Sequence, residues 1–387
     1  MTAAPAVLVS STTERSWAWT GVRIEPAPLL SDHQGWADRP ESARLHNAAA
    51  AELAWLRAMR LHTGTSFELR LSSRDGRLDA ALLGRASGTT AEQARQAAGA
   101  LAAALLHVPR HVHAVPVGDE TELAGLLALP GPVDGDPRVH LRELRKTLTV
   151  RPLSRHAELR PWTVTTSRLA ESRTPWDTVW TELAARPAPT VLAVCLHPYE
   201  VPAALTAHLE QRAHRYAALA TPGPGNPVWG GRRGPDHAAQ AARDHYADAA
   251  VRYARHCYQL RITLASLAPL PPGLAERVAE QLGAPGEATA VPVAPAEGEE
   301  HRVARHGLRT LDLHRLPHAH RTVQPPELVE EFDLALADLA DPAEAAVAFR
   351  LPYALPARPA LFHRLVTPLP AAPPPGAGRP TPLRPTL

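Results

Sequence analysis

Histidine is the residue type that offers the most chemistry in this chain, because 20 of its 387 residues are histidines. His111 and His113 are separated by one residue, so they would lie on the same face of a β-strand. A second group consists of His314, His318 and His320. Metal sites usually add a cysteine or a carboxylate to histidine ligands, and neither group has one at close spacing. We therefore predict no bound metal and no cofactor, with a metal site at one of these groups as the alternative.

A stretch rich in glycine, proline and arginine at 221–237 is a candidate for an anion site. Its Arg232 and Arg233 precede a predicted helix start near Asp236, and the N-terminus of a helix attracts anions. The Asp236 carboxylate would compete for the same backbone amides, and no strand leads into the stretch as a dinucleotide-binding fold requires. The sequence favours a mobile surface loop and leaves an anion site at the two arginines as the alternative.

Motifs of known hydrolases are missing from the sequence. A P-loop needs Gly-x4-Gly-Lys-Ser/Thr, whereas Lys146 is the only lysine and has no glycine before it. Neither the Gly-x-Ser-x-Gly turn of serine hydrolases nor the His-Glu-x-x-His pair of zinc proteases occurs. Asp244 and Asp248 lie one helical turn apart, as paired catalytic acids would, but nearby arginines favour a salt-bridged surface. The sequence excludes a P-loop hydrolase and favours a protein without catalytic activity.

The two cysteines, Cys195 and Cys257, are too few for a disulfide framework or a zinc knuckle. Cys195 lies in the apolar run 190–196, which predicts a buried strand, and a buried thiol behaves as a small hydrophobic group. No basic residue is near it in the sequence, so a reactive thiol is the lesser alternative.

Composition describes an ordinary globular chain. The 41 basic residues are interspersed with 39 acidic ones and leave a formal charge of +2, so bulk charge does not support direct binding of nucleic acid. No apolar run approaches the roughly 20 residues of a membrane helix. The bias toward arginine and alanine is typical of a GC-rich bacterial genome. We expect a cytoplasmic protein with no membrane span.

Two segments share a pattern that indicates an internal repeat. Residues 66–73 read SFELRLSS and residues 257–266 read CYQLRITLAS, which aligns Phe67 with Tyr258. An alanine-rich predicted helix precedes each segment, and the same offset aligns Trp55 in the first helix with Tyr246 in the second.

Downstream of each segment comes a helix and then a strand with the sequence Ala-Val-Pro-Val, at 114–117 and at 290–293. Proline lacks an amide donor, so each of these strands should lie at a sheet edge or end at its proline. In the first copy, Asp75 and Gly76 predict a tight hairpin, and a threonine with Glu92 predicts a capped helix at 89–107.

Such units predict an α+β fold with helices packed on mixed or antiparallel sheets. The expected organisation is a first unit at 14–130, a linker at 131–160, a second unit with an added helix–strand–helix block at 161–352, and a proline-rich disordered tail at 353–387.

Four stretches together resemble the non-motor N-terminal region of FtsK/HerA-superfamily ATPases of the conjugation and type IV secretion kind. They are residues 66–73, 78–101, 258–266 and 343–362. In that family a Phe-Arg-Leu-Pro-like segment often precedes the motor domain, and FRLP stands here at 349–352. Where the family continues into its P-loop domain, this chain has its proline-rich tail. The resemblance implies the accessory part of a motor, either made as a separate polypeptide or left over after loss of the motor domain.

The sequence therefore predicts a non-enzymatic interaction or scaffold protein. Its expected partner is a protein, namely a P-loop ATPase of a DNA-handling or secretion-type assembly acting in trans, with nucleic acid contacted only indirectly. The alternative is an enzyme or small-ligand-binding protein with a site lined by histidine and arginine between the two units.

Overall fold

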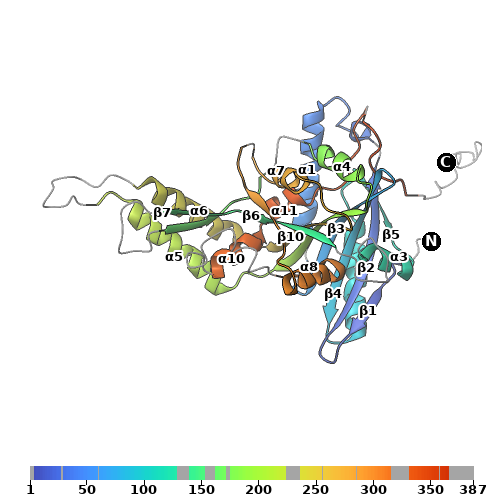
Figure 1. Cartoon of the computed structure of the whole chain (residues 1–387), viewed down its shortest axis with the longest axis horizontal. Helices are drawn as coiled ribbons and strands as arrows, with labels where there is room; N and C mark the ends of the chain where they lie inside the picture. Colours follow the sequence, from blue (N-terminus) through green and yellow to red (C-terminus); the bar gives the residue numbers. More distant parts are fainter. Residues whose placement is uncertain are drawn as a thin grey trace, which may run out of the picture.

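A ten-stranded antiparallel β-sheet organises the chain, with helices on both of its faces, so the fold is α+β (Figure 1). The computed structural model describes residues 4–27, 29–59, 61–128, 139–152, 162–170, 175–223, 236–254, 256–284, 286–314, 331–356 and 358–365.

The main path of the sheet runs in the order β1-β2-β4-β3-β9-β10-β6-β11, with β5 paired to β2 and β12 paired to β10. Its strands are β1 (Leu8–Ser11), β2 (Ser16–Pro26), β3 (Thr65–Arg74), β4 (Arg77–Gly88), β5 (Val112–Pro116), β6 (His140–Lys146), β9 (Thr190–Tyr199), β10 (Cys257–Ser266), β11 (Ala290–Val293) and β12 (Leu339–Ala340). A separate two-stranded sheet pairs β7 (Leu148–Pro152) with β8 (Trp162–Thr166).

The helices flank these sheets, and most of them follow directly on a strand or lead into one. They are the short 3-10 helix η1 (Leu30–Asp32) and the α-helices α1 (Glu41–Ala58), α2 (Ala91–Leu106), α3 (Glu120–Leu127), α4 (Asp177–Ala184), α5 (Ala203–Ala220), α6 (His237–Tyr253), α7 (Leu274–Glu280), α8 (Glu299–Thr310), α10 (Glu331–Asp338) and α11 (Pro342–Ala348).

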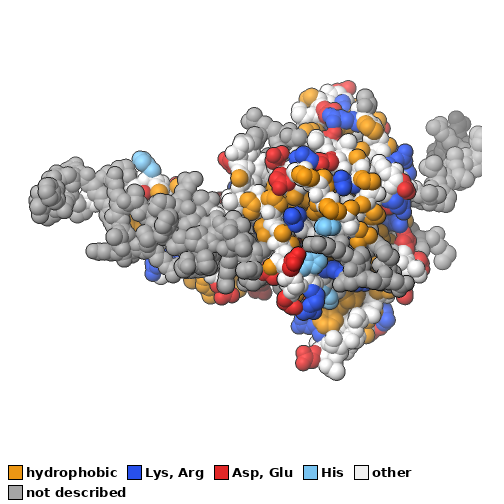
Figure 2. Space-filling view, in the orientation of Figure 1, with side chains coloured by type: hydrophobic (Ala, Val, Ile, Leu, Met, Phe, Trp, Pro, Cys, Tyr) orange, Lys and Arg blue, Asp and Glu red, His pale blue; other side chains and the backbone are white. Residues whose placement is uncertain are grey.

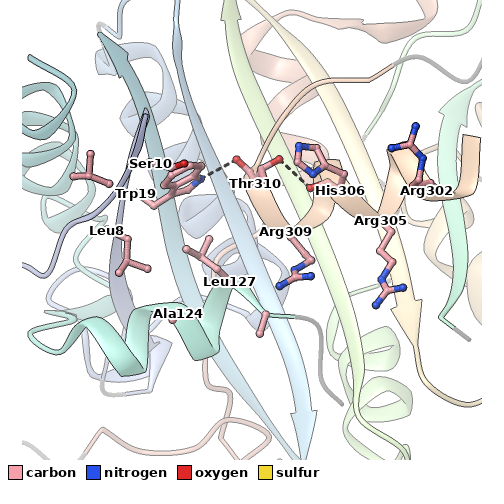
Figure 3. Close-up of a pocket in the computed structure, with 12 residues that line it drawn as sticks. Leu8, Ser10, Trp19, Ala124, Leu127, Arg302, Arg305, His306, Arg309 and Thr310 are labelled. Carbon is pink, nitrogen blue, oxygen red and sulfur yellow. Dashed lines mark hydrogen bonds between the residues drawn. The ribbon is translucent and has the colours of Figure 1, made fainter. Parts of the chain in front are cut away.

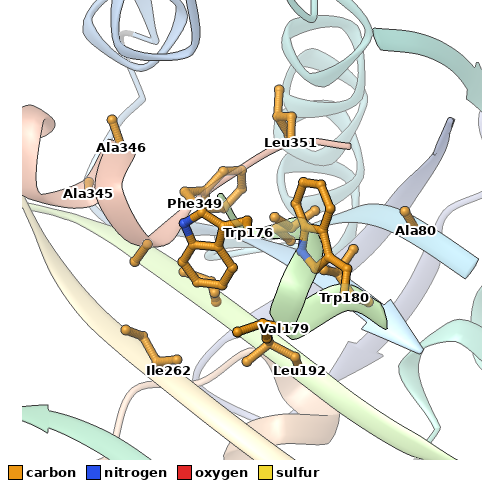
Figure 4. Packing of buried hydrophobic residues seen from close by; sticks show 14 of the residues in the cluster. Ala80, Trp176, Val179, Trp180, Leu192, Ile262, Ala345, Ala346, Phe349 and Leu351 are labelled. Carbon is orange, nitrogen blue, oxygen red and sulfur yellow. The ribbon is translucent and has the colours of Figure 1, made fainter. Parts of the chain in front are cut away.

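One face of the sheet is apolar and carries the main core. Alternate residues of a strand share a face, so Phe67, Leu69 and Leu71 of β3 point together into this core with residues of β9 and β10. Helices α1, α2, α4, α7 and α11 cover it. Figure 4 shows Trp176, at the N-cap of α4, and Trp180 of α4 beside the apolar side chains that follow α11. The apolar face supplies most of the hydrophobic stabilisation of the fold.

The opposite face is polar at its centre, although it is also buried. In the register of the sheet Glu68 pairs with Cys195, and Cys195 pairs with Arg261. Helix α8 and the residues after it cover this face, together with α3 beside β2.

Helices α5 and α6 form an arm that extends away from the body of the sheet (Figure 1). They pack against each other through their own apolar cluster, in which Tyr216 stacks on Tyr246 with ring centroids 5.6 Å apart. The β7–β8 ribbon contacts α6. The arm therefore has a small core distinct from the core of the main sheet.

The two repeat strands flank a common neighbour. β3 and β10 both pair with β9, and the rings of Phe67 and Tyr258 meet edge to face with centroids 5.9 Å apart. The preceding helices differ, because Trp55 contacts Phe67 in the main core whereas Tyr246 lies in the arm. The two strands thus share a neighbouring strand and the main core, whereas the two helices lie in different cores. The duplication itself stays a prediction.

Local predictions made from turn and proline chemistry are confirmed. Asp75 and Gly76 have φ values of 51° and 74°, as a two-residue hairpin with positive φ at both positions requires. Among the described strands β5 pairs with β2 alone and ends at Pro116, and β11 closes one end of the sheet path. The cap of α2 is one residue later than predicted, since Thr90 accepts a hydrogen bond from the amide of Gln93.

Two expected boundaries differ in the described residues. The range 131–160, expected to be a linker, contains β6, an inner strand of the sheet between β10 and β11, and also β7. The tail expected from residue 353 is ordered as far as Leu365, because Tyr353 and Phe362 pack on Trp180. Residues 366–387 lie outside the described residues. Polarity and proline content misled the prediction, since tertiary contacts bury these segments.

No helix within the described ranges is long and apolar enough to cross a bilayer. Over the described part of the face in Figure 2, acidic and basic side chains are interspersed, as the sequence predicts.

Lys146, the only lysine, is buried where β6 meets α6 and α11. Its Nζ lies 2.6 Å from Glu344 Oε1 and 3.1 Å from the Tyr253 hydroxyl, and Arg252 Nη1 lies 2.8 Å from Glu344 Oε2. Burial alone would lower the pKa of Lys146, but the Glu344 carboxylate and Tyr253 hold it above its ordinary value. The ammonium therefore stays charged inside the fold.

We expect Lys146→Met to lower the free energy of unfolding by about 3–5 kcal/mol, since it leaves part of the Glu344 charge buried without its partner. Arg302→Met is the matched control, because Arg302 pairs with Glu299 at the surface of α8. Denaturant unfolding followed by circular dichroism measures both. Equal midpoints for Lys146→Met and the wild type would contradict the structural role of this ion pair.

Candidate functional site

The polar face of the sheet is held together by buried ion pairs. Glu68 accepts hydrogen bonds from Arg70 Nε at 2.7 Å and from Arg261 Nη2 at 2.9 Å, and all three side chains are at most 2% exposed. Arg70 and Arg261 are the arginines that the predicted repeat aligns, so one carboxylate joins strands β3 and β10. Buried charges of this kind are tolerated only when they are paired.

A second cluster lies on the neighbouring strand β6. Glu143 accepts from Arg145 Nη2 at 2.5 Å and contacts His314 Nε2 at 2.5 Å, and Arg145 also pairs with Asp338. Burial raises the pKa of Glu143, but Arg145 and His314 together lower it to about 2. Glu143 is therefore ionised at neutral pH and serves as a fixed charge.

Side chains of β2, β3 and β10 hold the C-terminal end of α8 on the sheet. The last carbonyl groups of a helix lack helical partners and carry partial negative charge, so cations and other donors stabilise them. Leu311, which follows the helix, has a left-handed φ of 56°. The fastening bonds run from Arg70 to the carbonyl of Leu308 (2.5 Å), from Arg261 to that of Asp312 (2.8 Å), from Ser66 to that of Leu311 (2.9 Å), and from the Trp19 indole to that of Thr310 (2.9 Å).

An open groove of about 710 Å³ borders the exposed side of α8, as Figure 3 shows. Its apolar side is formed by Leu8 of β1, Trp19 of β2 and Leu127 of α3. Its opposite side is cationic. That side carries Arg302, Arg305, His306 and Arg309 of α8.

A second hollow of about 450 Å³ lies on the other side of α8. Its residues include His140 and Arg142 of β6, His301 of α8 and the acidic Glu297. Arg305 lines both hollows. The basic face of α8 is therefore a ridge between two depressions.

Each predicted metal-site histidine in the described residues pairs with its own glutamate. His111 Nε2 lies 3.1 Å from Glu52 and is fully buried, whereas His113 Nδ1 lies 3.2 Å from Glu25. His314 pairs with Glu143, far from both along the chain. Glutamates from other elements thus supply the carboxylates that the local sequence lacks. In the described ranges, however, no three His, Cys, Asp or Glu side chains lie close enough together to hold a metal ion.

Other candidates fall on residues that are not described. His318 and His320 lie within 315–330, and Arg232 and Arg233 lie within 224–235. Asp236, at the border of the second range, caps α6 by accepting from the amides of Ala238 and Ala239 at 3.0 and 3.1 Å. The predicted role of Asp236 as the cap of this helix is confirmed.

A cysteine and a histidine meet on the polar face, since Cys195 Sγ lies 3.4 Å from His197 Nε2. Burial raises the pKa of the thiol to about 12. Burial and the nearby Arg261 lower the pKa of the imidazole to about 3. Both groups are neutral at pH 7, whereas a nucleophilic pair needs a thiolate. Arg261 is the basic neighbour that the local sequence did not show, because it lies on the adjacent strand.

The groove is the site that sequence reasoning missed. The signal was present in α8, where Arg302, Arg305 and Arg309 have the i, i+3, i+7 spacing of one helix face.

No family model matches the chain, and no curated protein matches it.

Gly307 of α8 allows the helix to approach the polar face. A Cβ atom there would lie 2.6 Å from Arg261 Nη1 and closer still to the His314 ring. We expect Gly307→Ala to destabilise the protein by about 1–3 kcal/mol through overpacking. In Gly99→Ala, a control in α2 with open space around the new Cβ, helix propensity should instead add about 0.5–1 kcal/mol. Thermal melts of both variants test this; stabilisation of both would contradict the close packing of α8.

Acid should destabilise the fold through His197. A group whose folded pKa lies below its unfolded value favours the folded state above the unfolded pKa, and that stability is lost as the pH falls from 6.5 toward 3. Between pH 7 and pH 4.5, His197→Gln should lose about 1–3 kcal/mol less stability than the wild type. His306→Gln, at an exposed position of α8, is the control and should lose as much as the wild type. Urea titrations across this pH range give the comparison, and identical pH slopes for His197→Gln and the wild type would refute it.

Proposed function

We propose that this chain is a non-enzymatic interaction subunit that holds a protein partner in the groove beside α8. The observation that carries the proposal is the groove itself, which combines an apolar side with an arginine side and opens to the surface. Its arginine side belongs to a helix that buried side chains fasten to the central strands. A rigid binding surface loses little entropy on association, which favours binding.

The proposed partner is a P-loop ATPase of the FtsK/HerA kind acting in trans, and nucleic acid would be contacted through that partner. The sequence resemblance at 66–73, 78–101, 258–266 and 343–362 supports this choice. The FRLP segment of that resemblance packs internally here, with Phe349 against Phe67 at 5.3 Å between ring centroids and Arg350 paired with Glu52. The proposed location is the cytoplasm, where free thiols such as Cys195 and Cys257 are usual.

A second candidate function is the binding of a small anionic ligand in the same groove. The position of the groove favours it, since Trp19 and α3 come from the first predicted unit and α8 from the second. Its volume also falls within the range of small-molecule sites. Arginine pairs well with carboxylate and phosphate groups, so such a ligand would carry one of these.

Site-specific photocrosslinking in the native host tests the proposal. A photoreactive amino acid replaces Arg309 at the groove, and in the control it replaces Val251, which is 76% exposed on the α6 arm. We expect a discrete protein adduct at position 309 that is absent at 251, with a P-loop ATPase identified by mass spectrometry. Adducts at neither position, or the same adducts at both, would refute an interaction through the groove.

Thermal shift assays distinguish the second candidate. A rise in the melting temperature with a nucleotide or a dicarboxylate, abolished by Arg309→Glu, would favour small-ligand binding over the protein partner. No shift across a panel of such anions is the expected result.

A further inference from the structure

The basic face of α8 is a local feature that the near-neutral charge of the whole chain conceals. Arg302, His306 and Arg309 are exposed and Arg305 is partly exposed. No acidic residue is among those that line the larger groove in the described part of the chain. Arg302 pairs with Glu299 within α8, but an exposed pair of this kind is weak and can exchange its partner.

The apolar side of the groove faces this basic face across the groove. Figure 3 shows Leu8 and Trp19 on the strands and Leu127 on α3, opposite Arg309 and Arg305 of α8. The indole of Trp19 is held in place by its bond to the carbonyl of Thr310. A ligand that fills the groove must therefore present apolar groups on one side and negative charge on the other.

The larger groove favours an extended ligand over a small one. Arg302, Arg305 and Arg309 line it along two turns of α8, so a ligand that lies along the helix can contact all three. The arginines from 302 to 309 span about 10 Å along the helix axis, at roughly 1.5 Å per residue. Carboxylates with the same i, i+3, i+7 spacing on a neighbouring helix would match them.

Resting on the function proposed above, we infer that the groove binds an acidic amphipathic helix of a protein partner. Its apolar stripe packs on Leu8, Trp19 and Leu127, and its carboxylates pair with Arg302, Arg305 and Arg309. This is the helix-in-groove mode of peptide recognition. Single-stranded nucleic acid is less well matched, because it needs several exposed aromatic rings for base stacking, and Trp19 is the one aromatic residue among the described lining residues.

Fluorescence anisotropy with designed peptides tests the inference on the full chain. The probe is a labelled helical peptide of about five turns with leucines on one face and glutamates flanking them. A scrambled peptide of the same composition and a labelled oligonucleotide are the comparison probes. The acidic amphipathic peptide should bind the wild type at least about tenfold more tightly than either of them, and added salt should weaken its binding.

Charge reversal supplies the matched variants. The triple variant Arg302→Glu, Arg305→Glu, Arg309→Glu should weaken binding of the acidic peptide by about tenfold or more and should bind a peptide with lysines in place of the glutamates. The control triple Arg57→Glu, Arg77→Glu, Arg95→Glu changes net charge equally at exposed positions elsewhere and should bind like the wild type. Circular dichroism confirms that each variant is folded.

The outcomes separate this inference from the proposed function. Three results would contradict binding of an acidic helix. They are equal affinity for the scrambled peptide, unchanged affinity in the Arg302, Arg305 and Arg309 triple variant, and tighter binding of the oligonucleotide. If photocrosslinks at position 309 persist in that case, the groove has a protein partner of different chemistry. If those photocrosslinks also fail, the interaction function itself is wrong.

Discussion

The arrangement of the molecule depends on the bond between Glu68 and two arginines, one from each repeat strand. Arg70 and Arg261 share this carboxylate inside the sheet and use their remaining donors on the carbonyl groups of Leu308 and Asp312. Without Glu68, two guanidinium groups would be buried with no carboxylate between them, which is strongly unfavourable. The same contact therefore sets the position of α8 and, through α8, the shape of the surface groove.

This dependence explains why the sequence predicts individual strands and turns but not how the polar face is buried. The alternation in residues 66–73 correctly predicts a strand, and Asp75-Gly76 correctly predicts its hairpin. Alternation of polar and apolar residues normally places the polar ones in solvent. Here Glu68 and Arg70 face α8 and pair with each other, and further partners that permit their burial come from residues about 190 to 240 positions away. Local patterns carry no information about such contacts.

The candidate site was harder to predict than the fold for a related reason. Histidine clusters drew attention because they are unusual in the sequence, yet each described member proves to be the partner of a single glutamate. The arginines of α8 are unremarkable in a chain with so many arginines, and their importance comes from Leu8, Trp19 and Leu127 across the groove. Only the three-dimensional arrangement separates a binding surface from an ordinary charged helix.

The burial of Lys146 has a consequence for the covalent chemistry of the chain. Because Lys146 is the only lysine and its side chain is 2% exposed, the folded protein presents no lysine ε-amine to acylating reagents, ubiquitin ligases or amine-reactive crosslinkers. Reagents that act on accessible arginine would still modify it. Acylation of Lys146 would therefore show that β6 had separated from α6 and α11 and exposed the amine.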